Sequence, residues 1–137
     1  MDYREIEVPF HTYLGFTLEV DGSPSRLVQP LGEQIRGAVA PLHGGVLSTL
    51  LDVACGAAVG GNGDYDVTTT VPVSTRLDVQ FLGQPRSGPL VASGRIVARS
   101  AEAISVEGEV VDGGGYVIGR ATGTYRLVTG FLGHGGT

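Results

Sequence analysis

The sequence predicts one α+β domain in which a curved antiparallel sheet of about six strands wraps around one long helix. Three observations predict this fold class: residues 43–61 carry the only long helical pattern, short strand-like segments precede it, and longer strand-like segments follow it. The 137 residues suffice for one domain with its own core and are too few for two ordinary domains joined by a linker. One helix and about six strands favour a layer of sheet that packs around the helix.

The helical segment is HGGVLSTLLDVACGAAVGG, residues 43–61. It is rich in Leu and Ala and contains no Pro, and it closes on Gly60-Gly61, a pair typical of a helix C-terminus. We therefore expect a helix that starts at the His43-Gly44-Gly45 turn and ends near Gly60.

The segments on either side are typical of strands. Before the helix, the apolar stretches PFHTYLGFTLEV, SRLVQP and EQIRGAVAP are broken by Gly and Pro, which indicates a docking segment and two or three strands. After a loop over 60–66, residues 68–82 alternate with the period of a half-buried strand. The face expected to be buried carries Val71, Val73, Thr75, Leu77, Val79 and Phe81.

Three further segments, 88–100, 103–112 and 116–128, continue the alternation and are separated by turns at 84–88, 100–102 and 113–115. They predict a four-strand antiparallel meander after the helix. The single domain then spans residues 1–137, with a core over 9–128 and a flexible tail over 129–137.

The composition excludes several functional classes. The formal charge is −5, and the nine basic residues are all Arg, spread from Arg4 to Arg126 without a run, so neither nucleic acid nor an acidic membrane surface is an expected partner. The absence of Lys excludes a Schiff-base mechanism and a phosphate-loop Lys. The three His and one Cys show no metal-ligand spacing, so no metal site is expected.

The expected localisation rests on two features that the sequence lacks, an internal disulfide and an apolar N-terminal segment. Cys55 is the one cysteine and cannot form an internal disulfide, and the first ten residues lack the apolar segment of a signal peptide, so a reducing cytoplasm is expected. The longest apolar stretch, Val46 to Val59, is shorter than the roughly 20 residues that span a bilayer and contains Asp52, so no membrane helix is expected. A chain with 42% hydrophobic and only 17% charged residues is expected to bury surface in an oligomer.

One narrow face of the helix carries its polar residues. At about 100° per residue, one sector of the helical wheel collects Gly45, Ser48, Thr49, Asp52, Cys55 and Gly56. Asp52 is the only charge, and burying a carboxylate costs several kcal/mol unless it is paired or hydrogen-bonded. Asp52 is therefore either a functional group or a structural Asp that bonds to backbone groups across an interface.

The start of the helix offers a second candidate feature. Helix N-termini present unpaired N–H groups and a partial positive charge, which suit a phosphate or the oxyanion of an attacked carbonyl, and Gly44 and Gly45 would let a substrate approach the backbone. A plain tight turn is the alternative, and a second HGG at 134–136, with no helix after it, shows that the motif alone is weak.

The spacing of the two features has a geometric consequence. Gly44 and Asp52 are eight residues apart, which on a helix is about 12 Å. One small reacting group cannot touch both. If both serve one carbonyl, they come from different subunits whose helices face each other across a two-fold axis.

Taken together, these residues resemble the hotdog-fold acyl-CoA thioesterases of the phenylacetic-acid-degradation (PaaI-like) type. The resemblance covers residues 9–128 and rests on LGF at 14–16, PLHGGVLSTLLDVACG at 41–56 and VSTRLDVQFLGQP at 73–85. Its most specific element is the nine-residue step from His43 to Asp52.

The resemblance implies a hotdog fold and hydrolysis of an acyl-CoA thioester, with no cofactor beyond the CoA of the substrate. The Gly44 N–H would polarise the thioester carbonyl, and Asp52 of the other subunit would attack it or activate a water. His43 would shape the turn or bind near the thioester, and Ser74 matches a strand position that carries Ser or Thr near the attacking water. The expected assembly is a homodimer, arranged as a dimer of dimers.

One position departs from the family pattern. Relatives often carry Asn or Gln six residues before the motif His, where this chain has Gly37. Either Gln34 or Ser48 takes that role, or activity is weakened or lost. The candidate substrate-binding residues are Gly45, Ser48 and Gln34, with Arg76 and Arg86 for the phosphates of CoA.

Two other functions stay open. A hotdog dehydratase or hydratase that acts on acyl carrier protein or CoA substrates would pair a His with the helix carboxylate, and only His11 could supply that His. A non-catalytic acyl-CoA binder is the other, and the missing Asn or Gln favours it. Cys55 has no accompanying base and is expected to be core filler.

Overall fold

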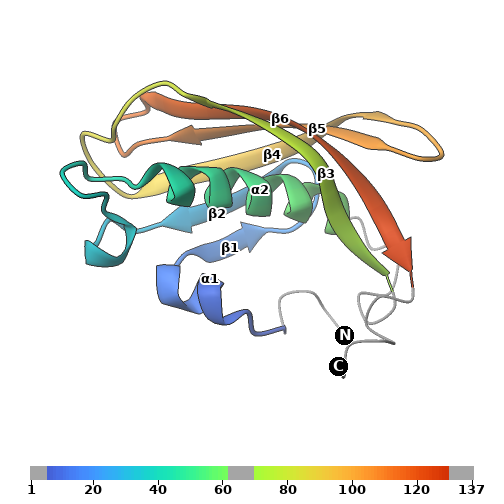
Figure 1. The fold of residues 1–137 in the computed structure, drawn as a ribbon, viewed down its shortest axis with the longest axis horizontal. Coiled ribbons are helices and arrows are strands. Elements are labelled where there is room, and N and C mark those ends of the chain that lie inside the picture. The colour runs from blue at the N-terminus through green and yellow to red at the C-terminus, as the bar shows by residue number, and fades with distance from the viewer. Residues whose placement is uncertain (1–5, 62–69, 130–137) are drawn as a thin grey trace.

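The computed structural model describes residues 6–61 and 70–129, and within them the predicted α+β fold is confirmed (Figure 1). The elements are α1 (Pro9–Leu14), β1 (Thr17–Val20), β2 (Ser25–Gln29), the 3-10 helix η2 (Glu33–Ile35), α2 (Gly44–Gly60), β3 (Thr70–Phe81), β4 (Leu90–Arg99), β5 (Ile104–Val111) and β6 (Val117–Thr129). Six antiparallel strands form one sheet in the order β1-β2-β4-β5-β6-β3. The sheet curves around α2, as expected for a hotdog fold.

The predicted long helix is confirmed at both ends. His43 is the residue before its first turn, and the N–H of Gly61 bonds to the carbonyl of Ala57 at its end. Its apolar side chains fill the core against the sheet, and Leu47, Leu50 and Leu51 are almost completely buried. None of the helices in residues 6–61 and 70–129 combines the length and hydrophobicity needed to cross a bilayer.

Two of the two or three strands predicted before α2 are present, β1 and β2. The stretch EQIRGAVAP forms no strand: it contains η2 and a turn in which the Gly37 N–H bonds to the Ala40 carbonyl at 2.9 Å. The chain must bend here to enter α2, and the His43 N–H closes the bend on the Ile35 carbonyl at 2.7 Å. The predicted docking segment contains a short helix, α1, followed by β1.

The predicted four-strand meander is also wrong in one respect. Strands β4, β5 and β6 are consecutive neighbours, but β3 pairs with β6 and lies at the edge of the sheet. Strand β4 already has β2 and β5 on its two sides, so β3 cannot pair with it. Alternation along the chain defines a strand and does not identify its neighbour. The turns predicted between the last three strands are present, while the predicted loop over 60–66 and tail over 129–137 lie largely outside the described residues.

A β-bulge in β3 reverses the predicted face of its first half. Ser74 pairs with Tyr125 and Arg76 with Thr124, so Thr75 is the extra residue. Cross-strand partners share a face of the sheet, and an extra residue shifts the alternation by one. Leu77 and Val79 face α2 as predicted. Ser74 also lies on the α2 side, and Val71 and Val73 therefore point away from it.

The sheet approaches α2 most closely where β4 has a glycine. A methyl group built on Gly94 would lie 2.6 Å from the carbonyl oxygen of Ala54 and 2.9 Å from the Cys55 nitrogen. Ser25 on β2 joins the same contact, because its hydroxyl donates to the Ala54 carbonyl at 2.6 Å and accepts from the Gly94 N–H at 2.9 Å. Helix and sheet thus meet backbone to backbone at this point.

We expect Gly94→Ala to lower the free energy of unfolding by about 1–3 kcal/mol, because the added methyl group must displace helix backbone. Urea denaturation measures this effect. Gly83→Ala is the matched control, since a methyl group there meets nothing within 4 Å and an exposed substitution changes stability by no more than about 0.5 kcal/mol. Equal stability of the two variants would contradict the close contact.

Candidate active site

The α2 N-terminus is capped by the side chain of His43. The backbone of His43 is extended, with φ −69° and ψ 132°, and its Nδ1 accepts the Gly45 N–H at 2.8 Å. Its carbonyl accepts the N–H groups of Val46 at 3.0 Å and Leu47 at 3.2 Å. A neutral imidazole that accepts at Nδ1 carries its proton at Nε2. His43 therefore shapes the turn directly.

Gly44, the first residue of the helix, keeps an exposed N–H. The neighbouring N–H groups of Gly45, Val46 and Leu47 all bond to His43, whereas within the described residues no acceptor bonds to the N–H of Gly44. The ring of Phe81, which is 61% exposed, lies beside it, and a methyl group on Gly44 would be 3.3 Å from Cε1 of Phe81. An N–H at a helix N-terminus that has no acceptor can bind a ligand oxygen.

Side chains missed by the sequence reasoning hold this turn in place. The amide of Gln84 accepts the Leu42 N–H at 2.9 Å and donates to the Leu42 carbonyl at 3.1 Å. The loop that carries Gln84 is anchored in turn by Asp112, whose carboxylate accepts the N–H groups of Arg86, Gly114 and Tyr116. These N–H groups, foremost that of Arg86, lower the pKa of Asp112 although burial opposes the change. No motif in the sequence identified Gln84 or Asp112, because their partners are backbone groups.

Asp52 lies two turns further along α2 and is half-buried. The hydroxyl of Tyr125 on β6 lies 2.6 Å from Oδ1 of Asp52 and 2.9 Å from its backbone carbonyl oxygen. Tyr125 is 2% exposed. The carboxylate therefore has a buried hydrogen-bond donor from its own chain, which the sequence reasoning did not anticipate.

Two further titratable groups respond to the charge of Asp52. Burial lowers the pKa of His11 on α1, and the Asp52 carboxylate raises it in part. Burial, and to a lesser degree the Asp52 charge, raises the pKa of the Cys55 thiol to about 12. The thiol is protonated at neutral pH and fully buried, so Cys55 is core filler as predicted.

The open side of α2 differs slightly from the predicted polar sector. Its positions that keep some solvent contact are Gly44, Gly45, Ser48, Thr49, Asp52, Val53, Gly56 and Gly60. Val53 thus takes the place that the helical wheel assigned to Cys55. The Ser48 hydroxyl donates to the Gly44 carbonyl at 3.2 Å, and the Thr49 hydroxyl donates to the Gly45 carbonyl at 2.8 Å. The polar side chains between the Gly44 N–H and the Asp52 carboxylate therefore bond to the backbone of their own helix.

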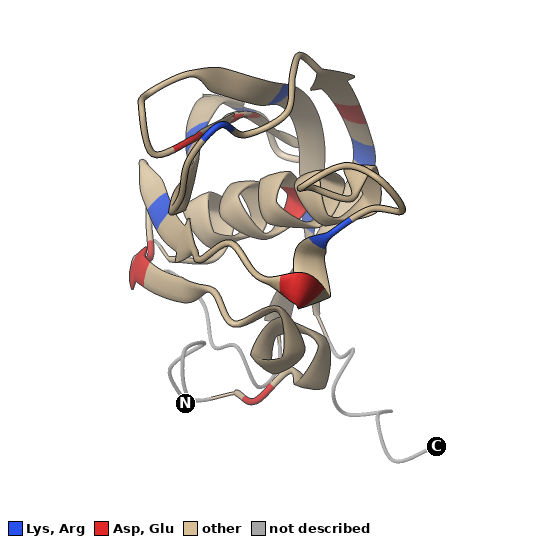
Figure 2. Ribbon diagram, turned by 90° about the vertical axis from the view of Figure 1, so that its left-hand side faces the viewer, with Lys and Arg blue, Asp and Glu red and all other residues tan. Residues whose placement is uncertain are grey.

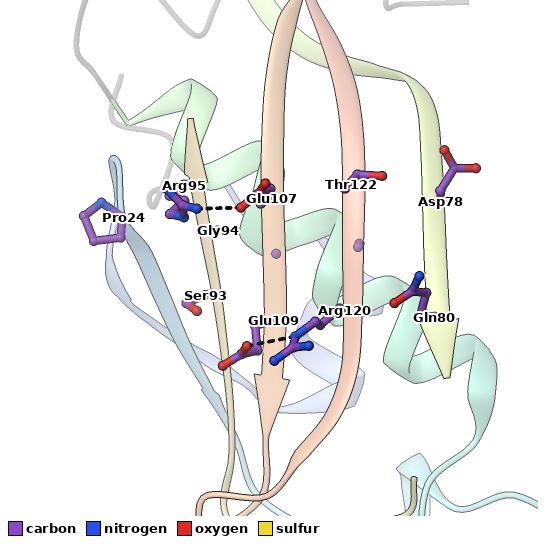
Figure 3. A pocket seen from close by; sticks show the side chains of 12 residues that line it. Pro24, Asp78, Gln80, Ser93, Gly94, Arg95, Glu107, Glu109, Arg120 and Thr122 are labelled. Atoms are coloured by element: carbon purple, nitrogen blue, oxygen red, sulfur yellow. Dashed lines mark hydrogen bonds and ion pairs between the residues drawn. The ribbon is translucent and has the colours of Figure 1, made fainter. Parts of the chain in front are cut away.

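A hollow of about 460 Å³ on the opposite face of the sheet is a separate feature (Figure 3). Two ion pairs line it, Arg95 with Glu107 at 2.6 Å and Arg120 with Glu109 at 3.2 Å. Basic and acidic residues are mixed over the described part of the molecule (Figure 2). The hollow therefore presents compensated charges, and neither Gly44 nor Asp52 lines it.

Comparison with known proteins identifies the family. The family model described as thioesterase superfamily matches residues 41–118, which include the HGG turn, α2, β3 and the strands up to the start of β6. The chain belongs to the thioesterase superfamily. No curated protein matches the sequence.

Several solved structures of other proteins are similar to this one. A mutant of a thioesterase enzyme from Staphylococcus aureus has 16% identity and a TM-score of 0.79, over 88% of this chain and 99% of that chain. A conserved protein from Pseudomonas aeruginosa has 19% identity and a TM-score of 0.81, over 92% and 98%. A Bacillus halodurans protein solved with CoA has 26% identity and a TM-score of 0.68, over 74% and 70%. At such identities the first two show the shared fold alone.

The other predicted site residues of this thioesterase-superfamily chain fall into two groups. Ser74 lies on the α2 side of the sheet, opposite Tyr125, whose hydroxyl bonds to Asp52. The side-chain amide of Gln34 donates to the Leu14 carbonyl at 2.9 Å. Arg76 follows the bulge on the outer face, 2.9 Å from Asp78. The structure thus places Ser74 on the same side of the sheet as Asp52 and Arg76 on the opposite side, while the Gln34 amide is bonded to the Leu14 carbonyl.

Arg86 occupies an intermediate place. Its guanidinium lies 4.0 Å from the centre of the Tyr116 ring. It is two residues from Gln84, which binds the backbone just before the HGG turn. Of the two arginines predicted to bind the phosphates of CoA, Arg86 is therefore the one whose loop contacts the backbone just before the α2 N-terminus.

Proposed function

We propose that this chain is an acyl-CoA thioesterase of the PaaI-like type that hydrolyses a thioester to a free acid and CoA. One observation carries the proposal: α2 presents a capped turn whose Gly44 N–H has no acceptor in the described residues, and the same helix presents a carboxylate on its open side. Membership of the thioesterase superfamily supports a thioester substrate. The Bacillus halodurans relative with bound CoA supports CoA as its thiol part.

In this mechanism the Gly44 N–H and the positive end of α2 bind the thioester oxygen as it gains negative charge. Asp52 of the partner subunit takes a proton from a water that attacks the carbonyl carbon, or attacks the carbon itself. The C–S bond breaks, and the thiolate of CoA leaves and takes up a proton. If Asp52 attacks the carbon itself, a water then hydrolyses the anhydride formed between Asp52 and the acyl group, which releases the free acid and restores the carboxylate. Ser74 binds the attacking water, and Gly45 and Ser48 border the acyl chain.

The two catalytic groups come from different chains in this proposal. They are about 12 Å apart along one helix, and a homodimer brings one of each together. Strand β3 supports this arrangement because it is an edge strand, with Ser74 opposite the Asp52 partner Tyr125 toward one end and Phe81 against Gly44 at the other. Antiparallel pairing of β3 with its copy about a two-fold axis would place the Ser74 end of one chain opposite the Phe81 end of the other. Dimers then pair into a tetramer.

The remaining assignments of this proposal concern CoA and the location of the chain. Arg86, and more weakly Arg76, would bind the phosphates of CoA. Gln34 would take the role of the missing Asn or Gln only if its side-chain amide broke its hydrogen bond to the Leu14 carbonyl. His43 would bind near the thioester through Nε2. The expected location is the cytoplasm.

A second candidate, a hotdog hydratase, is favoured by one observation. Burial lowers the pKa of His11, and the charge of Asp52 partly opposes this change, so the two side chains lie within electrostatic reach of each other. Such an enzyme would add water to the double bond of a 2-enoyl thioester and release no thiol.

The two candidates differ in product, so one experiment tests both. The protein is incubated with aryl-CoA, saturated fatty acyl-CoA and 2-enoyl-CoA substrates, and free thiol is measured beside loss of the enoyl absorbance. Thiol release from the saturated and aryl substrates supports the thioesterase. Loss of enoyl absorbance without thiol favours the hydratase, and tight binding without either reaction identifies a non-catalytic binder.

Gly37 provides a gain-of-function prediction. A methyl group built there would make ordinary contacts at 3.6–3.7 Å with Ala40 and with Cα of His43, and the position has no positive φ, so a side chain fits. We expect Gly37→Asn to raise kcat/KM by about tenfold, the effect of one hydrogen bond to a charged or reacting group. Gly37→Ala is the control and should leave the rate unchanged. No gain with Asn would show that position 37 does not face the substrate in this chain.

A further inference from the structure

We infer that Tyr125 is a positioning residue for Asp52: it holds one carboxylate oxygen and turns the other toward the site. The inference rests on the proposed function, in which the Asp52 carboxylate reacts with the thioester or with water. Tyr125 itself contacts no reacting atom in this proposal and acts through Asp52.

The geometry of the contact is that of a strong hydrogen bond. The Tyr125 oxygen is 2.6 Å from Oδ1 of Asp52, the short distance found when a hydroxyl donates to an ionised oxygen. The carbonyl oxygen of Asp52 lies at 2.9 Å. A phenol has one proton, so it donates to one oxygen at a time, and the shorter distance favours Oδ1.

The ring of Tyr125 is buried and closely packed, so its hydroxyl has a defined position beside Asp52. It is 2% exposed and packs in the cluster with Cys55, Ala58, Val59, Ile104 and Val106. A methyl group built on Gly56 would lie 3.7 Å from Cε2 of the ring, so α2 passes directly over it. Because the ring is buried and packs against the helix that carries Asp52, the hydrogen bond favours one orientation of the carboxylate.

The β3 bulge adds a second residue to the same place. It puts Ser74 directly opposite Tyr125 on the α2 side of the sheet. In a strand without the bulge, Thr75 would pair with Tyr125, and Ser74 would pair with Arg126 on the outer face. The bulge therefore places two hydroxyl-bearing residues, one on β3 and one on β6, opposite each other on the α2 side of the sheet.

A one-oxygen anchor suits a carboxylate that reacts at its other oxygen. Oδ1 is occupied by Tyr125, so Oδ2 is left for the water or carbonyl carbon presented from the partner subunit. Proper placement of a reacting group accounts for a large share of enzymatic rate, and a displacement of about 1 Å can cost roughly 100-fold. The other titratable groups within reach of the Asp52 charge are His11 from α1 and Cys55 from α2.

Tyr125→Phe tests the inference, because it removes the hydroxyl and keeps the ring. We expect kcat for thiol release to fall by about 10- to 100-fold with KM unchanged within about twofold. In a crystal structure of the variant, Asp52 should occupy more than one side-chain conformation.

Tyr13→Phe is the matched control, since it removes a hydroxyl from an exposed tyrosine on α1 and should leave kcat and KM unchanged. A melting temperature lowered by no more than about 8 °C shows that Tyr125→Phe is folded. Unchanged kcat, with KM either unchanged or raised, would overturn the inference. Absence of thiol release in the wild type would refute the proposed function instead, and the order of Asp52 in the two crystal structures would still decide whether Tyr125 holds the carboxylate.

Discussion

Replacing Gly44 by proline is expected to lower kcat for thioester hydrolysis by about 10²–10³-fold, the effect of removing one donor from an oxyanion site. Proline has no N–H, and the N–H of Gly44 is the proposed donor. The substitution suits this position for two reasons. Proline is favoured at the first residue of a helix, and the extended backbone of His43, at φ −69° and ψ 132°, is the conformation that a following proline requires.

The helix should survive this change because the Gly44 N–H bonds to no acceptor in the described residues. Gly44→Ala is the matched control. It adds a first side-chain carbon 3.3 Å from the exposed Phe81 ring and keeps the N–H. Steady-state kinetics should show a loss of no more than a few fold for the alanine variant. Equal losses in the two variants would mean that crowding, and not the missing donor, lowers the rate.

Asp52→Asn is expected to lower kcat by about 10²–10⁴-fold, the range attributed to a positioned acid or base. The amide has nearly the same shape, and its oxygen can still accept from the Tyr125 hydroxyl, so the fold should be kept. Single-turnover measurement of thiol release isolates the chemical step.

Glu107→Gln provides the control for a change of carboxylate to amide. Glu107 lies on the outer face of the sheet, paired with Arg95. This variant should keep full activity. Thiol release that survives Asp52→Asn would exclude Asp52 as the reacting group, whatever the role of Gly44.

The fold was predictable where one local pattern determines one element. The Leu- and Ala-rich segment closed by Gly60-Gly61 predicted α2 to its last residue. Strand pairing was less predictable because the alternation of β3 is equally compatible with β4 or β6 as its neighbour. The bulge at Thr75 could not be recognised either. In the sequence Val71 and Val73 continue the apolar alternation of Leu77 and Val79, but the bulge turns them to the face of the sheet that points away from α2.

The residues of the candidate site were likewise predictable where they lie close together in the sequence, and not where only the fold brings them together. Gly44, His43 and Asp52 were accessible from the sequence because spacing along one helix relates them. Tyr125 was not, because it is 73 residues from Asp52 and meets it only through the sheet. Gln84 is likewise 42 residues from Leu42, and its role depends on the path of the loop after β3.

A mixed dimer of the Gly44→Pro and Asp52→Asn variants tests most directly whether each site takes its two groups from different chains. The two variants are co-expressed with different affinity tags, and the heterodimer is isolated over both. One of its two sites would then combine an intact Gly44 with an intact Asp52, so thiol release should recover to about half of the wild-type rate per dimer. Activity that stays at the level of the two inactive parents would place both groups in one chain and contradict the shared site.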